Sequence, residues 1–151
     1  MVQSQESFKS ADIGFRNFAG HEGPYNKEGD RSFAIFLDPD RAQELEKDGW
    51  NIKWPKPMEG ANQEEDTRRP YLQVAVAFNN FPPKVALIDA NGPTLLEEEA
   101  VDMLDWAEIE EADVVIRPYN WTVNGKTGIK AYLKAIYVTI VTDEFSKKYG
   151  I

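Results

Sequence analysis

Alternation of hydrophobic and polar positions predicts that most of this chain forms β-strands. Short segments rich in Gly, Pro, Asn and Asp separate the alternating or β-rich runs. Because successive side chains of a strand point to opposite faces, each run is expected to bury one face and expose the other. The predicted strands are residues 12–18, 32–37, 50–54, 71–78, 84–88, 114–123 and 129–142.

Two helices are expected between these strands. The first has Asp38 as its cap, Pro39 at its first position and Gly49 just past its end. The second begins at Thr94 and Glu97, which have the spacing of a capping box. Four apolar residues of this second helix share one face while acids cover the other: Leu96, Ala100, Met103 and Leu104.

The order of these elements predicts a mainly β, OB-like antiparallel β-barrel with a short early helix. A late acidic helix followed by a long terminal hairpin is typical of that fold, which binds single-stranded nucleic acids and oligosaccharides. Other small barrels are compatible with the same order. The 151 residues contain no repeat, so we expect a single domain over 1–151. Residues 55–69 are expected to form a flexible surface loop and 143–151 a tail.

The last hairpin carries the most specific signal. Asn124-Gly125 lies between two alternating runs, which is typical of a two-residue hairpin turn. With that turn, residues whose numbers add to 249 face each other, so Tyr119 lies opposite Lys130. A four-residue loop gives the same faces, whereas an odd loop would separate them. Two triplets then share the outward face, namely Arg117, Tyr119, Trp121 and Lys130, Tyr132, Lys134. The inward face would hold Val114, Ile116, Pro118, Ala131, Leu133 and Ala135.

This face of interleaved bases and aromatics is suited to a single strand of nucleic acid. Aromatic rings stack on unpaired bases, and Lys and Arg neutralise phosphates. The alternative is an ordinary cross-strand aromatic cluster covered by lysine stems. Trp50 and Trp54 are assigned to the core, with Lys53 on the opposite face. The candidate binding residues are Arg117, Tyr119, Trp121, Lys126, Lys130, Tyr132 and Lys134, with Lys53 and Arg16 as outliers.

The charge distribution is compatible with this face although the net charge is −9. Residues 97–113 hold nine of the 26 acids and no base, and the remaining 17 acids match the 17 bases. Residues 114–142 carry four bases and no acid. Because salt screens repulsion beyond about 8–10 Å, an acidic protein can bind a polyanion through a locally positive surface.

The sequence offers little for catalysis or for a cofactor. Cysteine is absent, and the one histidine, His21, lies in a Gly- and Pro-rich segment without a nucleophile beside it. Residues 125–128 lack the upstream glycine of a phosphate-binding loop. Adjacent acids such as Glu97 and Glu98 do not converge on a metal ion. We therefore expect neither catalysis, nor a cofactor, nor a bound metal.

No apolar run approaches the roughly 18 residues of a membrane span. The first residues lack the basic and apolar regions of a signal peptide. The expected location is the cytoplasm.

Several segments resemble a group of small bacteriophage and prophage proteins that includes suspected single-stranded-DNA-binding proteins. The resemblance covers nearly the whole chain and is carried by residues 17–20, 29–33, 37–38, 49–54, 71–74, 104–106, 116–119 and 123–134. The last helix and hairpin also look like the end of bacterial single-stranded-DNA-binding proteins. Those proteins finish in an acidic tail with a terminal Phe, a pattern that Lys147 and Lys148 break here.

The resemblance and the hairpin together favour a non-catalytic, phage-type protein that binds single-stranded DNA in replication or recombination. The expected partners are single-stranded DNA or RNA, proteins of replication or recombination, and further copies of the chain, with no membrane. A rival hypothesis is a protein-interaction or DNA-mimic module that uses the acidic 97–113 surface. A third is a structural β-protein of the virion.

Overall fold

Nine strands and two helices are present in the computed structural model, which describes residues 5–24, 26–55, 69–79 and 81–141. The predicted loop 55–69, apart from its two end residues, and the predicted tail 143–151 lie outside these ranges. In chain order the elements are β1 (Glu6–Phe8), β2 (Asp12–Asn17), β3 (Arg31–Phe36), α1 (Pro39–Lys47), β4 (Ile52–Lys53), β5 (Tyr71–Val76), β6 (Lys84–Asp89), β7 (Gly92–Leu95), η2 (Glu98–Asp105), β8 (Ile109–Val123) and β9 (Lys126–Ile140).

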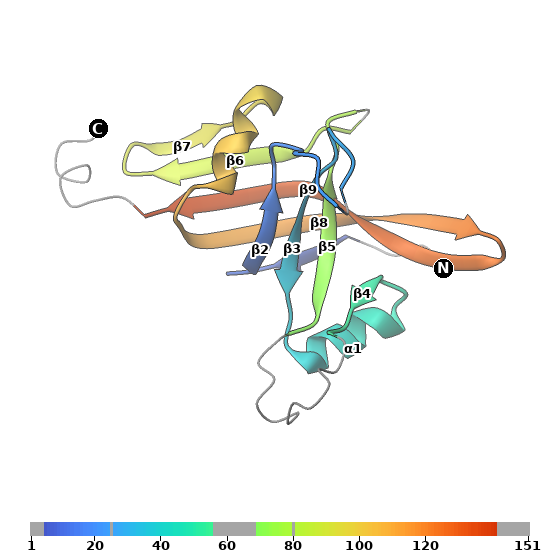
Figure 1. Ribbon diagram of the computed structural model, residues 1–151. Coiled ribbons are helices and arrows are strands. Elements are labelled where there is room, and N and C mark those ends of the chain that lie inside the picture. The colour runs from blue at the N-terminus through green and yellow to red at the C-terminus, as the bar shows by residue number, and fades with distance from the viewer. Residues whose placement is uncertain (1–4, 25, 56–68, 80, 142–151) are drawn as a thin grey trace.

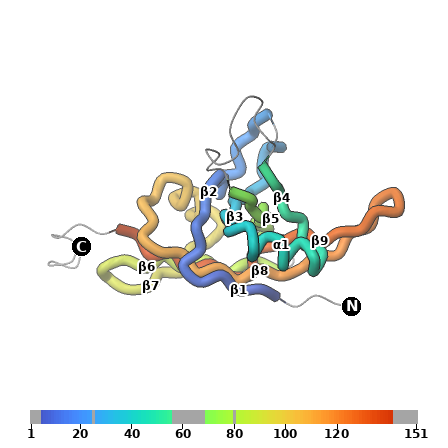
Figure 2. Tube along the Cα trace, turned by 90° about the horizontal axis from the view of Figure 1, so that it is seen from below, coloured from blue at the N-terminus to red at the C-terminus, as the bar shows by residue number. Residues whose placement is uncertain are grey.

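The long hairpin of β8 and β9 is the centre of the architecture (Figure 1). One edge of β9 pairs with β8, and the other edge pairs first with β5 and then with β6. The described strands follow the order β1-β8-β9-β5-β3-β2, with β4 beside β5 and the β6–β7 ribbon beside β9. Figure 2 shows β1 running beside β8 and the hairpin tip projecting from the body.

The mainly β prediction is confirmed, but two details of the predicted barrel are wrong. The pairing of the described strands leaves the sheet open, with β1 and β2 at the two ends of its path. The pairings of β9 with β5 and with β6 are parallel, so the sheet is not wholly antiparallel.

The early helix forms where the sequence predicts it. The Asp38 side chain accepts a hydrogen bond from the Arg41 backbone N–H at 2.8 Å, and Pro39 starts the helix. Ala42 and Leu45 bury one face of α1. The chain then returns to β9, where Trp50 forms a parallel bridge with Ile129 and is 2% exposed. The segment that follows α1 thus lies beside the first part of β9, near the turn of the hairpin.

The acidic helix differs from the expected one. Thr94 belongs to β7, where it pairs with Leu87, so it is not a helix cap. The helix is the 3-10 helix η2, with Glu97 as an N-cap that makes no side-chain cap hydrogen bond. Val101 and Leu104 are its buried residues, while Ala100 and Met103 are only partly buried. A helix therefore forms where the amphipathic pattern predicts one, but it is a 3-10 helix, and its buried residues are not all the predicted ones.

The core lies between the inward face of the β8–β9 hairpin and the inward faces of β3 and β5. Val114, Ile116, Ala131, Leu133 and Ala135 are buried, as the hairpin parity predicts, and Pro118 is partly buried. Trp54 is an exception to the predicted core. It is 40% exposed, and its Nε1 donates a hydrogen bond to Glu46 at 2.7 Å, because β4 ends at Lys53 before the alternation can continue.

Candidate nucleic-acid interface

The register of the hairpin places the predicted basic and aromatic side chains on one face. Tyr119 lies opposite Lys130, Arg117 opposite Tyr132, and Trp121 opposite Gly128, so paired numbers add to 249. This is the register expected for the two-residue Asn124-Gly125 turn, in which both residues adopt positive φ angles.

Tyr132 is the centre of a set of ring contacts on this face. The Tyr119 ring meets it edge-on, with ring centroids 5.7 Å apart. The Arg117 guanidinium lies 4.9 Å and the Lys130 ammonium 5.1 Å from the centroid of the same ring. The Arg117 guanidinium also lies 5.5 Å from the exposed Phe81 ring. Two cations therefore flank an aromatic surface, which is the pairing of charges and rings that a nucleic-acid strand requires.

Arg117 contributes more than charge to this arrangement. Its Nε is buried and has no hydrogen-bond acceptor in the described part of the chain. The guanidinium is held by two aromatic rings, Phe81 and Tyr132, in place of a carboxylate. Its positive charge is consequently not neutralised by a neighbouring acid in the described structure.

Trp121 is fixed by the glycine across the hairpin. A Cβ atom added to Gly128 would lie 2.5 Å from Cζ2 and 2.7 Å from Cε2 of the indole. The ring therefore lies directly on the backbone of β9, and it is partly exposed where it lines a groove described below. Only a residue without a side chain allows this close approach.

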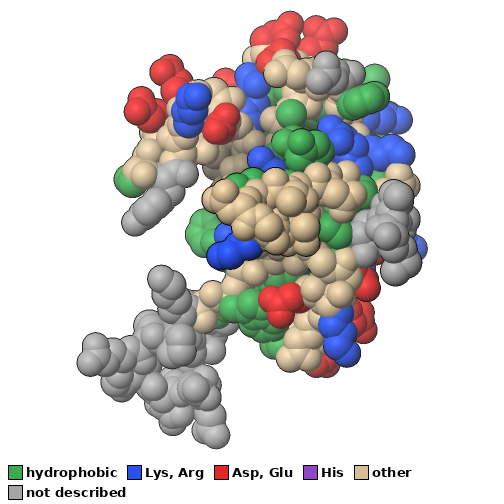
Figure 3. All heavy atoms as spheres, turned by 90° about the vertical axis from the view of Figure 1, so that its right-hand side faces the viewer, with side chains coloured by type: hydrophobic (Ala, Val, Ile, Leu, Met, Phe, Trp, Pro, Cys, Tyr) green, Lys and Arg blue, Asp and Glu red, His purple; other side chains and the backbone are tan. Residues whose placement is uncertain are grey.

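A groove runs from this face onto the neighbouring strands. It has a volume of about 630 Å³ and is lined by Trp121, Lys130 and Tyr132 from the hairpin and by Lys53 from β4. Gln73 and Ala75 of β5 and Ser32 of β3 form part of its wall. In Figure 3, which looks onto the side from which the hairpin projects, Lys and Arg side chains lie between acidic groups at the upper and lower margins.

The groove also contains charged residues that the sequence analysis did not single out. Arg31, at the start of β3, and Glu98 of η2 both line it. Arg31 Nη1 lies 3.1 Å from Glu98 Oε1, and Arg31 Nε donates to the Phe18 carbonyl at 3.0 Å. Asp30 is a second acid in the lining. The sequence does not single out Arg31, because the predicted strand begins at Ser32 and the alternating pattern therefore assigns Arg31 to no face.

Three predicted residues have other positions. Lys126 lies beside the hairpin turn and is exposed. Lys134 is on the face of Tyr132, but it is the extra residue of a bulge, and its Nζ donates to Gln5 Oε1 at 2.5 Å. Arg16 lies away from the hairpin face. Its Nη1 donates to the carbonyls of Leu104 and Ala107, at 2.7 and 2.8 Å, so it joins β2 to the end of η2.

Several acids of residues 97–113 bind other groups of the chain. Glu98 pairs with Arg31, and Asp105 accepts hydrogen bonds from the backbone N–H groups of Phe18 and Ala19. Glu111 and Asp113 both accept hydrogen bonds from Ser10. Four of the nine acids thus bind groups of the chain itself, which disfavours a DNA-mimic surface.

Within the described ranges, no group of three or more His, Asp or Glu residues is placed to hold a metal ion. None of the helices in those ranges is long and apolar enough to cross a membrane.

A family model described as "Putative phage ssDNA-binding domain" matches residues 3–151. Among solved structures, the C-terminally truncated single-stranded DNA-binding protein from bacteriophage Enc34 has a TM-score of 0.56 at 12% identity, covering 93% of this chain and 87% of that one. The same phage protein in complex with single-stranded DNA has a TM-score of 0.55 at 11% identity, covering 94% and 89%. The curated protein sequences contain no match.

The similarity to the Enc34 protein confirms the predicted fold at the level of an OB-like, mainly β arrangement. The family match extends over nearly the whole chain and confirms the resemblance noted in the sequence. This protein belongs to the family of phage single-stranded-DNA-binding domains.

Proposed function

We propose that this chain binds single-stranded DNA along the groove between the hairpin face and β5. The main observation in support of this proposal is that Trp121, Lys130 and Tyr132 of the hairpin line the same groove as Lys53 of β4. Bases would stack on Trp121 and Tyr132, with Tyr119 extending the surface, while Lys53, Lys130 and Arg117 neutralise phosphates. The family and the DNA complex of the similar Enc34 protein support this proposal.

Binding of this kind depends little on sequence. Each stacked base contributes about 1–3 kcal/mol because every base has an aromatic face. The groove is open, so a strand can enter from the side without being threaded through the protein. We propose a role in phage replication or recombination in the host cytoplasm, without catalytic activity. Proteins of those processes and further copies of the chain on the same strand would be its partners, and RNA is a second ligand to test.

Salt should weaken this binding in proportion to the phosphates contacted. With about two to four contacts, the logarithm of affinity should fall with the logarithm of salt concentration with a slope of roughly −1.4 to −2.8. The measurement is a titration of oligo-dT followed by tryptophan fluorescence at several salt concentrations. Lys130→Ala should reduce the magnitude of the slope by about 0.7.

Lys47→Ala is the matched control, because Lys47 is an exposed lysine of α1 outside the groove lining. It should leave both affinity and slope nearly unchanged. Absence of binding to DNA or RNA single strands at low salt would contradict the proposed function and favour the protein-interaction hypothesis.

The Arg31–Glu98 ion pair should lower the affinity for single-stranded DNA, because Glu98 competes with a phosphate for Arg31. Glu98 is about half exposed, with 53% of its side chain accessible, so its pairing with Arg31 is weak enough for a phosphate to replace it. Glu98→Gln should tighten binding of single-stranded DNA by about 1.4- to 5-fold, since removal of an exposed pair changes free energies by about 0.2–1 kcal/mol. The same titration should show a slope steeper by about 0.7, because one more phosphate is neutralised.

Glu99→Gln removes the same charge one residue away, where the side chain is exposed and belongs to the same helix. An equal gain from both variants would mean that general repulsion, and not the pairing with Arg31, limits affinity.

A further inference from the structure

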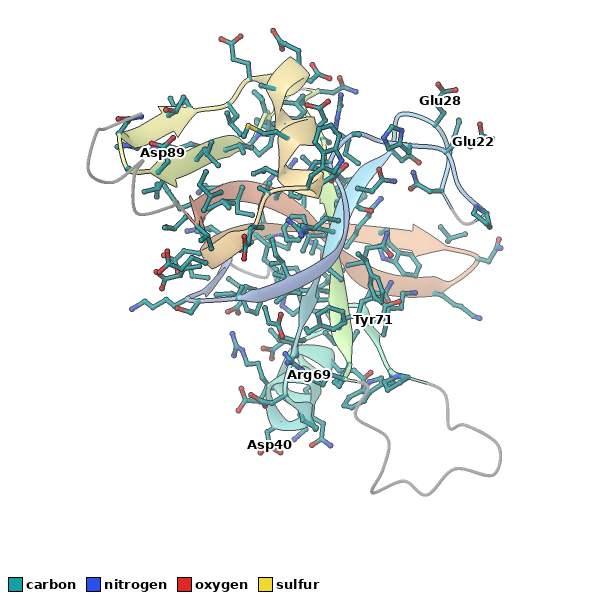
Figure 4. All side chains as sticks on the ribbon, turned by 60° about the vertical axis from the view of Figure 1, so that its left-hand side comes forward. Glu22, Glu28, Asp40, Arg69, Tyr71 and Asp89 are labelled. Carbon is teal, nitrogen blue, oxygen red and sulfur yellow. The ribbon has the colours of Figure 1, made fainter. Side chains whose placement is uncertain are left out.

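A second aromatic cluster lies on the sheet outside the groove and is formed by Phe15, Phe36 and Tyr71. The ring centroids of Phe15, Phe36 and Tyr71 are 5.3, 5.4 and 6.0 Å apart in pairs, and every pair is edge-on. The Arg69 guanidinium lies 5.8 Å from the centroid of Phe36, and Arg69 Nη1 is 2.7 Å from Asp12 Oδ2. Figure 4 labels Tyr71 at the start of β5 and Arg69, two residues earlier, close to α1. The proposed function leaves this cluster unused.

The cluster is on the same face of the sheet as Tyr132. Tyr132 pairs with Ala75 of β5, and Ala75 pairs with Ser32 of β3. Side chains of paired residues share a face, and so do residues two positions apart along one strand. Tyr71 is four positions before Ala75 and pairs with Phe36, which places both rings on that shared face.

Small residues make the path between the two aromatic groups shallow and open. A second hollow of about 370 Å³ is lined by Phe15 and Tyr71 and shares Asn26, Ser32 and Gln73 with the main groove. Gly14 lies directly beneath Phe36, because a Cβ atom there would be 2.4 Å from Phe36 Cε2. The two hollows therefore form one continuous track across β9, β5, β3 and β2.

The backbone of Phe15 has a strained conformation, and packing of its side chain does not explain why this strain is kept. Its φ angle is +45°, which bulky residues rarely adopt, and it lies where the β2–β3 register shifts between Gly14 and Asn17. Its side chain is 68% exposed, so burial recovers little of the cost. The strain holds an aromatic ring out of the sheet and over the track.

We propose that Phe15 and Tyr71 form a second stacking platform for bases of the same DNA strand, with Arg69 and Lys53 beside its phosphates. This inference rests on the proposed function and adds the direction and length of the site. Tyr132 and Phe15 are on strands three spacings apart, roughly 14 Å. That span corresponds to about four nucleotides at the 3.4 Å spacing of one stacked strand.

Oligo-dT of increasing length tests the two platforms separately, from about 2 nucleotides, which is shorter than this span, to about 16 nucleotides. Affinity is measured by fluorescence anisotropy of labelled oligonucleotides. The unmodified protein should show a rise in affinity at the length that reaches both platforms. Phe15→Asn should abolish this rise, lowering affinity for long strands by roughly 5- to 150-fold and leaving short strands nearly unaffected.

Asparagine is chosen because it accepts positive φ, so the variant should fold. Phe15→Tyr keeps a ring and should retain the rise, whereas Trp121→Ala should weaken binding at every length. If the unmodified protein binds but Phe15→Asn keeps the same length dependence, the second platform is wrong and the proposed function stands. If no length binds, the proposed function itself fails.

Discussion

Tyr132→Ala is expected to weaken binding of single-stranded DNA by about 1–3 kcal/mol while Leu133→Ala, one residue further, unfolds the protein readily. The two side chains occupy opposite faces of β9. Tyr132 is partly exposed and lines the groove, whereas Leu133 is 1% exposed and lies in the core opposite Ile116. Loss of a buried leucine costs about 2–5 kcal/mol of the free energy of unfolding because a cavity remains.

Thermal melting and oligo-dT affinity of the same purified variants give the comparison. Trp121→Ala should behave like Tyr132→Ala, and the folded fraction of Leu133→Ala should bind normally. The reverse pattern, with unfolding of the two aromatic variants and tolerance of Leu133→Ala, would mean that the aromatic residues stabilise the fold and do not form the binding face.

Arg16→Ala is expected to lower stability without lowering the affinity of the folded protein. Its guanidinium donates two hydrogen bonds to the carbonyls of Leu104 and Ala107 and so joins β2 to η2. Hydrogen bonds that involve a charged group contribute about 1.5–3 kcal/mol each, so we expect a loss of about 3 kcal/mol or more. For a domain of this size the melting temperature should fall by roughly 6–12 °C.

Arg16→Lys should recover part of the loss, because a lysine can reach one carbonyl but cannot match the guanidinium geometry. The decisive readouts are again the melting temperature and the affinity for oligo-dT. An Arg16→Ala variant that melts normally but binds oligo-dT weakly would contradict this structural role and support the sequence-based prediction that Arg16 contacts the DNA.

The hairpin face could be predicted because its geometry is local. A two-residue Asn-Gly turn fixes the register of the strands that leave it, and the period of two then assigns every side chain to a face. The predicted pairing holds as far as Leu133, which lies opposite Ile116. Beyond it a bulge at Lys134 shifts the pairing by one residue, and no feature of the alternating pattern marks that point.

The groove could not be predicted in the same way, since it depends on contacts between distant segments. Parallel pairing of β5 with β9 brings Ala75 beside Tyr132. No short turn connects these two strands, so the sequence contains no local signal for their pairing. Residues 12–18 illustrate a second difficulty. Simple alternation places Ile13 and Phe15 on one face, but the irregularity after Gly14 exposes Phe15 while Arg16 reaches η2.

The contact between Trp121 and Gly128 has an evolutionary consequence. Any side chain at position 128 would meet the indole ring, and loss of the indole would leave the glycine backbone uncovered. Neither position can therefore drift independently of the other while the stacking surface is kept. In related chains the residues at these two positions should covary. A residue larger than glycine at position 128 should occur together with a smaller ring at position 121.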